Sequence, residues 1–162
     1  MKTATCVAAA IPLVLPLALL ATPAAAATIS GSPALALAAI AATHSPQLSP
    51  ADRKAVAAIF DGKASGATRG IITILVDKIV CRISNVDITA RSCELSFGDK
   101  TQSLRGREAN EMYSTEAMAG VPSEGAAGSS FESLSKLKCT LDPEAIKRND
   151  GSGAQCSYEA AN

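Results

Sequence analysis

Hydrophobic residues follow two different spacings along this chain. Alternation of apolar and polar residues, together with β-branched runs, predicts strands over 71–83, 92–97, 100–104, 137–141 and 154–159. Apolar residues three or four positions apart predict helices from Pro50 up to Gly62 and from Arg107 to Ala119. The strands therefore form neighbouring pairs that can join as hairpins, with helices on either side of the first group.

Residues at the helix ends support these boundaries. Ser49 can cap the first helix, with a proline at the first helical position and Asp52 three residues after the cap. Gly120 follows the second helix, at a position where glycine commonly ends a helix. Asp142 precedes a proline and predicts a short helix that runs to Arg148.

The pattern Ser129-x-x-Glu132 is a capping box, and it predicts one more short helix with Phe131 and Leu134 facing inward. The full order is then helix, three strands, helix, short helix, strand, short helix, strand. This order is typical of an α+β fold, with a small antiparallel sheet of about five strands in hairpins and helices packed on one face.

The N-terminal 26 residues have the composition of a secretory signal peptide, with Lys2, a long apolar run and three alanines at positions 24–26. We expect cleavage after Ala26 or Ala27 and export to the bacterial periplasm or exterior. The protein would then meet a membrane only transiently, through this segment. Retention of the segment as a membrane anchor is the alternative.

The residues from 27 to 49 are rich in Ala, Pro and Ser and predict a flexible arm ahead of a single domain over 50–162. The apolar stretch Ala34–Thr43 could form a short helix within this arm. Our interpretation is a loosely packed tether, since alanines bury little area. An apolar segment that docks on a partner or on a second copy is the alternative.

Four cysteines follow the signal segment, and four cysteines allow three disulfide connectivities. If the strands 71–83 and 92–97 pair as a hairpin with Cys81 opposite Cys93, Ile79 lies opposite Leu95 on the same face. One register thus brings two cysteines and two apolar residues together. We therefore predict the bridges Cys81–Cys93 and Cys139–Cys156.

Other uses of these cysteines fit the spacing less well. The chain has no C-x-x-C redox motif, and its cysteines are too far apart for an ordinary zinc site. A cysteine nucleophile needs a base, and the single histidine, His44, falls in the predicted arm. We predict structural disulfides, no metal and no cofactor.

Charge and motifs exclude further classes of function. Lysines and arginines number 15, and so do aspartates and glutamates; there is no basic run and no Trp. Nucleic-acid binding is therefore not expected. Enzyme chemistry is not expected either, because no G-x-S-x-G motif is present. Glu108 and Glu111 share a helix face, so a small carboxylate-dependent hydrolase is the alternative.

The sequence favours an exported, non-enzymatic binding module with an unknown envelope or extracellular protein as partner; an inhibitor is one form of this hypothesis. A structural envelope component anchored by its N-terminal segment is another alternative. The loops 84–90 and 120–130 are the predicted binding surface. Their candidate residues are Asn85, Val86, Asp87, Pro122, Ser123 and Glu124.

Overall fold

The structure, a computed structural model, describes residues 26–63, 70–82, 84, 87–121, 130–148 and 150–160. The strands are β1 (Ala26–Ser30), β2 (Ile72–Arg82), β3 (Ser92–Phe97), β4 (Lys100–Arg105), β5 (Ser130–Leu141) and β6 (Ala154–Ala160). The helices are α1 (Ser32–His44), α2 (Pro50–Phe60), α3 (Arg107–Met118) and α4 (Pro143–Lys147), with 3-10 turns η1 (Ile88–Ala90) and η2 (Gly151–Gly153).

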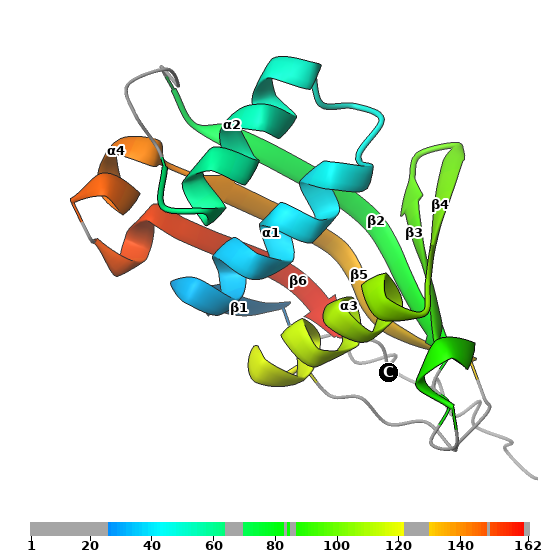
Figure 1. Ribbon diagram of the computed structural model, residues 1–162. Helices are drawn as coiled ribbons and strands as arrows, with labels where there is room; N and C mark the ends of the chain where they lie inside the picture. The colour runs from blue at the N-terminus through cyan, green and yellow to red at the C-terminus, as the bar shows by residue number, and fades with distance from the viewer. Residues whose placement is uncertain are drawn as a thin grey trace, which may run out of the picture.

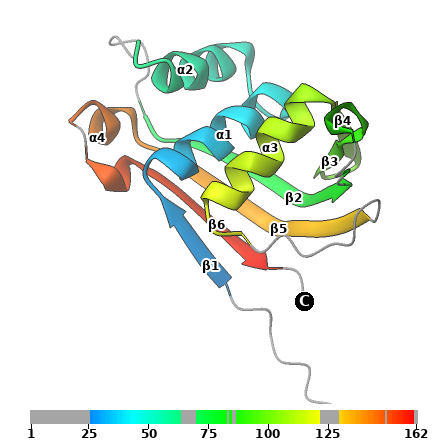
Figure 2. The same cartoon turned by 60° about the horizontal axis from the view of Figure 1, so that its bottom comes forward.

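The strands form one six-stranded open sheet in the order β1-β6-β5-β2-β3-β4, and every neighbouring pair is antiparallel. Helices α1, α2 and α3 cover one face, and no helix among the described residues covers the other (Figures 1 and 2). Strand β2 alternates between these faces, with Ile72, Ile74 and Val76 buried beneath the helices. The α+β prediction is confirmed.

The predicted register of β2 and β3 is also confirmed. Cys81 pairs with Cys93, and Ile79 pairs with Leu95. A second pair of cysteines, Cys139 on β5 and Cys156 on β6, face each other in the same way. Both predicted disulfides are therefore formed, and each one joins adjacent strands of the sheet.

The N-terminal arm expected over 27–49 is instead folded into the domain. Its first residues form β1, which pairs with β6, and its apolar stretch forms α1 across the middle of the helix layer (Figure 1). The prediction of a loose arm is wrong because alanines occur all around α1, so the sequence shows no single apolar face that would indicate a buried helix. The small alanine side chains let α1 lie close to the sheet. The fully or almost fully buried residues of α1 are Ala34, Leu37, Ala38, Ala41 and Ala42.

The capping-box helix predicted after Ser129 is wrong, since Ser130 to Leu141 form one continuous strand, β5. The pairing of β5 shifts register against β2 between Ile79 and Val80, and against β6 between Ser135 and Lys138. Such bulges add a residue to one strand and break the two-residue alternation. Leu134 and Leu137 can therefore both face the core although they are three residues apart, a spacing that also suits a helix. Ser129 lies outside the described residues.

The other helix ends agree with the sequence. The Ser49 hydroxyl accepts a hydrogen bond from the backbone N–H of Asp52 at 3.1 Å, and Asp142 caps α4 in the same manner. Gly120 has a φ of 73°, the left-handed conformation that glycine adopts most readily. None of the described helices is long and apolar enough to cross a membrane. The predicted signal segment lies outside the described residues, except for Ala26 at the start of β1.

Candidate functional site

Most of the predicted binding-loop residues lie outside the described residues, namely Asn85, Val86, Pro122, Ser123 and Glu124. Asp87 is described and exposed. Its carboxylate accepts hydrogen bonds from the backbone N–H of Thr89 at 2.8 Å and from the Thr89 hydroxyl at 2.7 Å. These bonds from Thr89 hold the pKa of Asp87 below its ordinary value. The described contacts make Asp87 a turn-forming residue, and a binding role for the loop stays a prediction.

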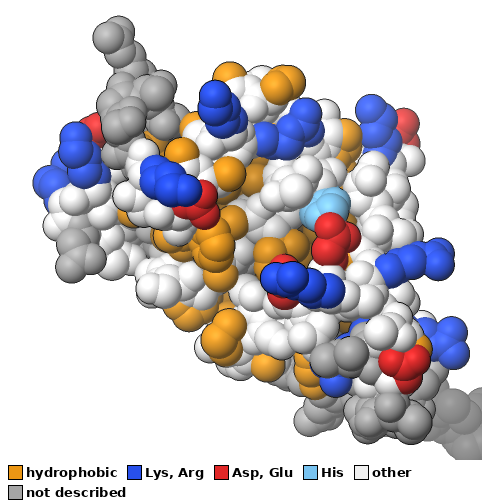
Figure 3. All heavy atoms as spheres, viewed as in Figure 1, with side chains coloured by type: hydrophobic (Ala, Val, Ile, Leu, Met, Phe, Trp, Pro, Cys, Tyr) orange, Lys and Arg blue, Asp and Glu red, His pale blue; other side chains and the backbone are white. Residues whose placement is uncertain are grey.

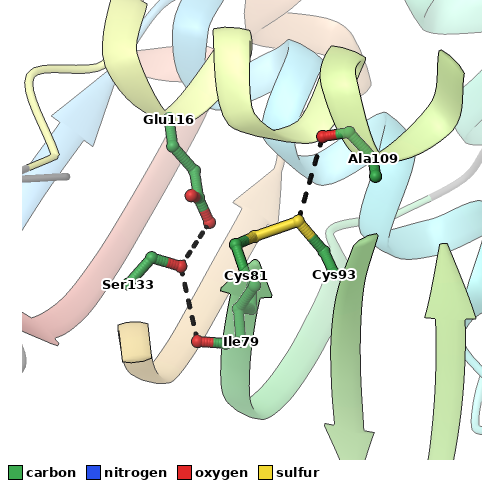
Figure 4. The surroundings of a disulfide bond; sticks show 6 residues. All are labelled: Ile79, Cys81, Cys93, Ala109, Glu116 and Ser133. Carbon is green, nitrogen blue, oxygen red and sulfur yellow. Dashed lines mark hydrogen bonds between the residues drawn. A yellow bond between two sulfur atoms is a disulfide. The ribbon is translucent and has the colours of Figure 1, made fainter. Parts of the chain in front are cut away.

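The cysteines form structural bridges. All four side chains are buried, with exposed fractions of 0–2%. The sulfur of Cys93 lies 3.8 Å from the Ala109 carbonyl on α3 (Figure 4). The sulfur of Cys156 lies 3.5 Å from the Ala34 carbonyl on α1. These are packing contacts, since a disulfide sulfur carries no proton to donate. Each bridge thus joins two strands and also supports one helix.

The clearest hollow in the described part of the chain is a groove in the helix layer. Helix α1 forms its floor, while α2 and α3 form its two sides, and its volume is about 540 Å³. Figure 3, viewed from the helix side, shows apolar side chains gathered along this face. The lining residues are Ala36, Ala39, Ile40, Thr43, Ala57, Phe60, Asp61, Asn110, Glu111, Ser114, Thr115 and Met118.

Two large apolar side chains stand exposed at this groove. Phe60, the last residue of α2, is 53% exposed, and Met118, the last residue of α3, is 69% exposed. Water contact with such side chains is unfavourable by about 25 cal/mol for each Å². Exposed apolar side chains grouped around one hollow are typical of a surface that binds a partner.

The charged side chains that line the groove are both acidic. Asp61 pairs with Lys63 at 3.2 Å, and Glu111 pairs with Arg107 at 2.9 Å, but neither basic residue lines the groove. All four side chains are at least half exposed, so these ion pairs are weak and screened by water. The groove therefore offers an apolar floor with an acidic group on each side.

Beneath the groove, α3 inserts a carboxylic acid against the sheet. Glu116 is fully buried, and its Oε1 accepts a hydrogen bond from the Ser133 hydroxyl at 2.8 Å (Figure 4). Its Oε2 has no hydrogen-bond partner among the described residues. Burial raises the pKa of Glu116 to about 7, although the hydrogen bond from Ser133 acts in the opposite direction. The last turn of a helix also disfavours an anion.

The buried face of α3 includes polar residues. In the sequence, the residues that recur at helical spacing are Ala109, Met112, Tyr113 and Ala117, whereas the buried residues of α3 are Ala109, Met112, Thr115 and Glu116. Glu116 follows Met112 by four residues, so the helical spacing did place it on the apolar face. Its charge masked that signal, because acidic residues are rarely buried.

The groups that a hydrolase could use lie on α1 and α3. Glu108 and Glu111 are both exposed on α3, and Glu111 alone of the two lines the groove. His44, at the end of α1, is half-buried and is not among the groove-lining residues. The part of the chain that the structure describes has no cluster of three His, Cys, Asp or Glu side chains that could hold a metal ion.

Comparison with protein-family models, with curated proteins and with solved structures finds no match to this chain.

Proposed function

We propose that this protein is an exported, non-enzymatic binding module of the periplasm or cell exterior, and that it binds a protein partner through the groove between α1, α2 and α3. The observation that carries the proposal is the pairing of an apolar hollow of about 540 Å³ with the exposed side chains of Phe60 and Met118. A hollow of this kind can accept the apolar face of a partner helix.

The shape of the floor supports a helical occupant. Ala36 and Ala39 lie on the outward side of α1, where their short side chains leave the helix backbone close to the surface. Ile40 and the two exposed apolar residues then border this shallow channel. Because Asp61 and Glu111 are the charged lining residues, the partner segment that fits best is amphipathic, with basic residues beside its apolar stripe.

The compartment is supported by two features. Paired cysteines that form buried cross-strand disulfides are typical of proteins that fold in an oxidising compartment. The signal-like N-terminal segment also supports export from the cytoplasm. An inhibitor and an envelope-protein partner are two versions of this function, since each would use the groove to hold another protein.

Variants on opposite faces of the sheet test the proposal. We expect Phe60→Ser and Met118→Lys to weaken capture of a crosslinked envelope partner by about tenfold or more, because they remove apolar contact from the groove. Leu75→Ser is the matched control, since Leu75 is also apolar and 44% exposed but lies on the uncovered sheet face. Equal capture by all the variants would contradict the groove as the binding surface.

The variant Asp87→Ala tests whether the partner binds to the groove or to the loop 84–90 that the sequence predicted. If the partner binds in the groove, this variant captures it as well as the wild type does. Loss of capture in Asp87→Ala, with capture retained by Met118→Lys, would place the binding surface on the loop 84–90 instead.

A further inference from the structure

The last turn of α3 contacts the sheet on one side and the groove on the other. Glu116 points from this turn toward the sheet, where its side chain is fully buried (Figure 4). Thr115 and Met118, one residue before it and two residues after it, line the groove. A displacement of Glu116 would therefore also move one side of the groove.

The backbone of Glu116 closes the end of the helix. Its carbonyl accepts a hydrogen bond from the N–H of Val121 at 3.0 Å, and the Ala117 carbonyl accepts one from the N–H of Gly120 at 3.1 Å. These two bonds around a left-handed glycine form a Schellman motif. Val121 is itself buried in the core. Glu116 thus fixes the end of α3 through both its side chain and its backbone.

The contact beneath Glu116 depends on whether the residue carries a proton. The Ser133 hydroxyl lies 2.8 Å from Oε1 of Glu116 and 3.4 Å from the Ile79 carbonyl. It has one proton and can donate to one of these oxygens at a time. A neutral Glu116 donates its own proton to the Ser133 oxygen, so the serine proton remains for the Ile79 carbonyl. An ionised Glu116 takes the serine proton and leaves that carbonyl without it.

The site therefore suits the neutral acid better than the carboxylate. Ile79 lies at the register shift between β2 and β5, where the regular strand pairing is interrupted, so its carbonyl benefits from a hydroxyl donor. Oε2 of Glu116 has no partner among the described residues, and an unpaired buried oxygen costs more on an ion than on a neutral group. The carbonyl end of a helix also disfavours a negative charge.

Charged groups around Glu116 do not compensate an ionised carboxylate. On the strands beneath it and the strands that pack against α3, the described charged side chains are all exposed. They are Asp77, Lys78 and Arg82 on β2, Glu94 on β3, Lys100 and Arg105 on β4, and Lys136 and Lys138 on β5.

Three other titratable groups on neighbouring elements are at least half-buried. They are His44 at the end of α1, Tyr158 on β6 and Arg91 beside η1, whose guanidinium is bound to the Asn110 side chain. None of them contributes to the raised pKa of Glu116, which results from burial and is opposed only by the hydrogen bond from Ser133.

We propose that Glu116 is a pH-controlled latch, which holds the last turn of α3 in place as a neutral acid and releases this turn when it ionises. Release lets the carboxylate reach water, and it displaces Thr115 and Met118 at the groove. The latch is a property of the fold itself, whereas its consequence for a partner rests on the proposed function. Partner binding in the groove should then be strongest under mildly acidic conditions.

Hydrogen exchange of the backbone amides at 115–121 tests the latch without a partner. After correction for the intrinsic exchange rate, opening of this turn should increase about tenfold from pH 6 to pH 8, as expected when a pKa of about 7 returns to 4.5 on opening. Glu116→Gln keeps a similar shape and does not ionise, so its opening should be equal at the two pH values.

His44→Gln is the matched control, because histidine side chains in general change charge between pH 5 and 8. This variant should keep the tenfold increase. Equal opening of the wild-type turn at the two pH values would overturn the latch. An increase that persists in Glu116→Gln, or that is lost in His44→Gln alone, would overturn it as well.

Photocrosslinking from the Ile40 position at pH 6 and pH 8 tests the consequence for the partner. We expect several-fold less crosslinked partner at pH 8 in the wild type and equal amounts in Glu116→Gln. Equal crosslinking in the wild type, with the exchange effect present, would overturn control of the groove by the latch. Absence of a crosslinked partner at both pH values, with the exchange effect present, would contradict the proposed function and still support the latch.

Discussion

Glu116 is a carboxylic acid held between α3 and the sheet, where its side chain is fully buried. Its pKa, raised to about 7, means that the folded protein favours the neutral acid, while the unfolded chain ionises near the ordinary value of 4.5. The stability that this residue contributes is therefore fully present below about pH 4.5 and is lost as the pH rises through about 7.

Glu116→Gln isolates this effect. Gln has a similar shape and does not ionise, so the variant should be more stable than the wild type by about 3 kcal/mol near pH 8 and similar in stability near pH 4.5. Urea unfolding at the two pH values measures the difference. Glu108→Gln is the control on the same helix, because Glu108 is exposed. An unchanged pH dependence in Glu116→Gln would contradict the assignment.

Ser133 is the hydrogen-bond donor of Glu116, at 2.8 Å. Ser133→Ala would leave the buried carboxyl without this partner, and we expect a loss of about 1–3 kcal/mol in the free energy of unfolding. The pKa of Glu116 should rise further, because the bond from Ser133 lowers it. Ser135→Ala serves as a control, since Ser135 makes a longer bond to the Glu159 carbonyl at 3.4 Å. Equal losses in the two variants would contradict the special role of Ser133.

At the scale of elements, α1 decides whether the groove exists. Leu37 on α1 is fully buried, so Leu37→Ala should lower the free energy of unfolding by about 2–5 kcal/mol. Ala36→Ser, on the outward side of the same helix, should change it by less than about 0.5 kcal/mol. Thermal or urea unfolding measures both. A wild-type transition in Leu37→Ala would mean that α1 is a loose arm after all.

The elements also show where sequence reasoning succeeds and fails. Strands β2 and β3 were predictable because Cys81, Cys93, Ile79 and Leu95 agree on one register. The first half of β5 was not, because its two bulges replace alternation with a spacing that resembles a helix. The position of α1 could not be predicted because alanines lie on both of its sides. Some are buried against the sheet and others line the groove, so the sequence shows no polar face.

At the scale of the whole molecule, each disulfide stabilises one half of the sheet. One bridge joins β2 to β3, and the other joins β5 to β6, with sequence separations of 12 and 17 between the paired cysteines. Loss of either bridge should cost about 3 kcal/mol, chiefly by freeing the unfolded chain. The paired variants Cys81→Ala with Cys93→Ala, and Cys139→Ala with Cys156→Ala, measure this by urea unfolding. Wild-type stability in both would contradict a structural role.

The candidate surfaces could be predicted only in part. The sequence located both bridges, but the groove needs α1, α2 and α3 to be side by side, and their contact is not encoded in any local pattern. Of the predicted loop residues, Asp87 is the one that the structure describes, and its contacts are those of a turn.

Photocrosslinking from the groove tests the central claim, that a protein partner binds to the helix layer, most directly. A photoreactive amino acid replaces Ile40 in the groove in one variant and Leu75 on the uncovered sheet face in the other. We expect one saturable crosslinked partner from the Ile40 position, lost when Met118→Lys is added, and none from the Leu75 position. Crosslinking of the same partner from Leu75 alone would contradict the account.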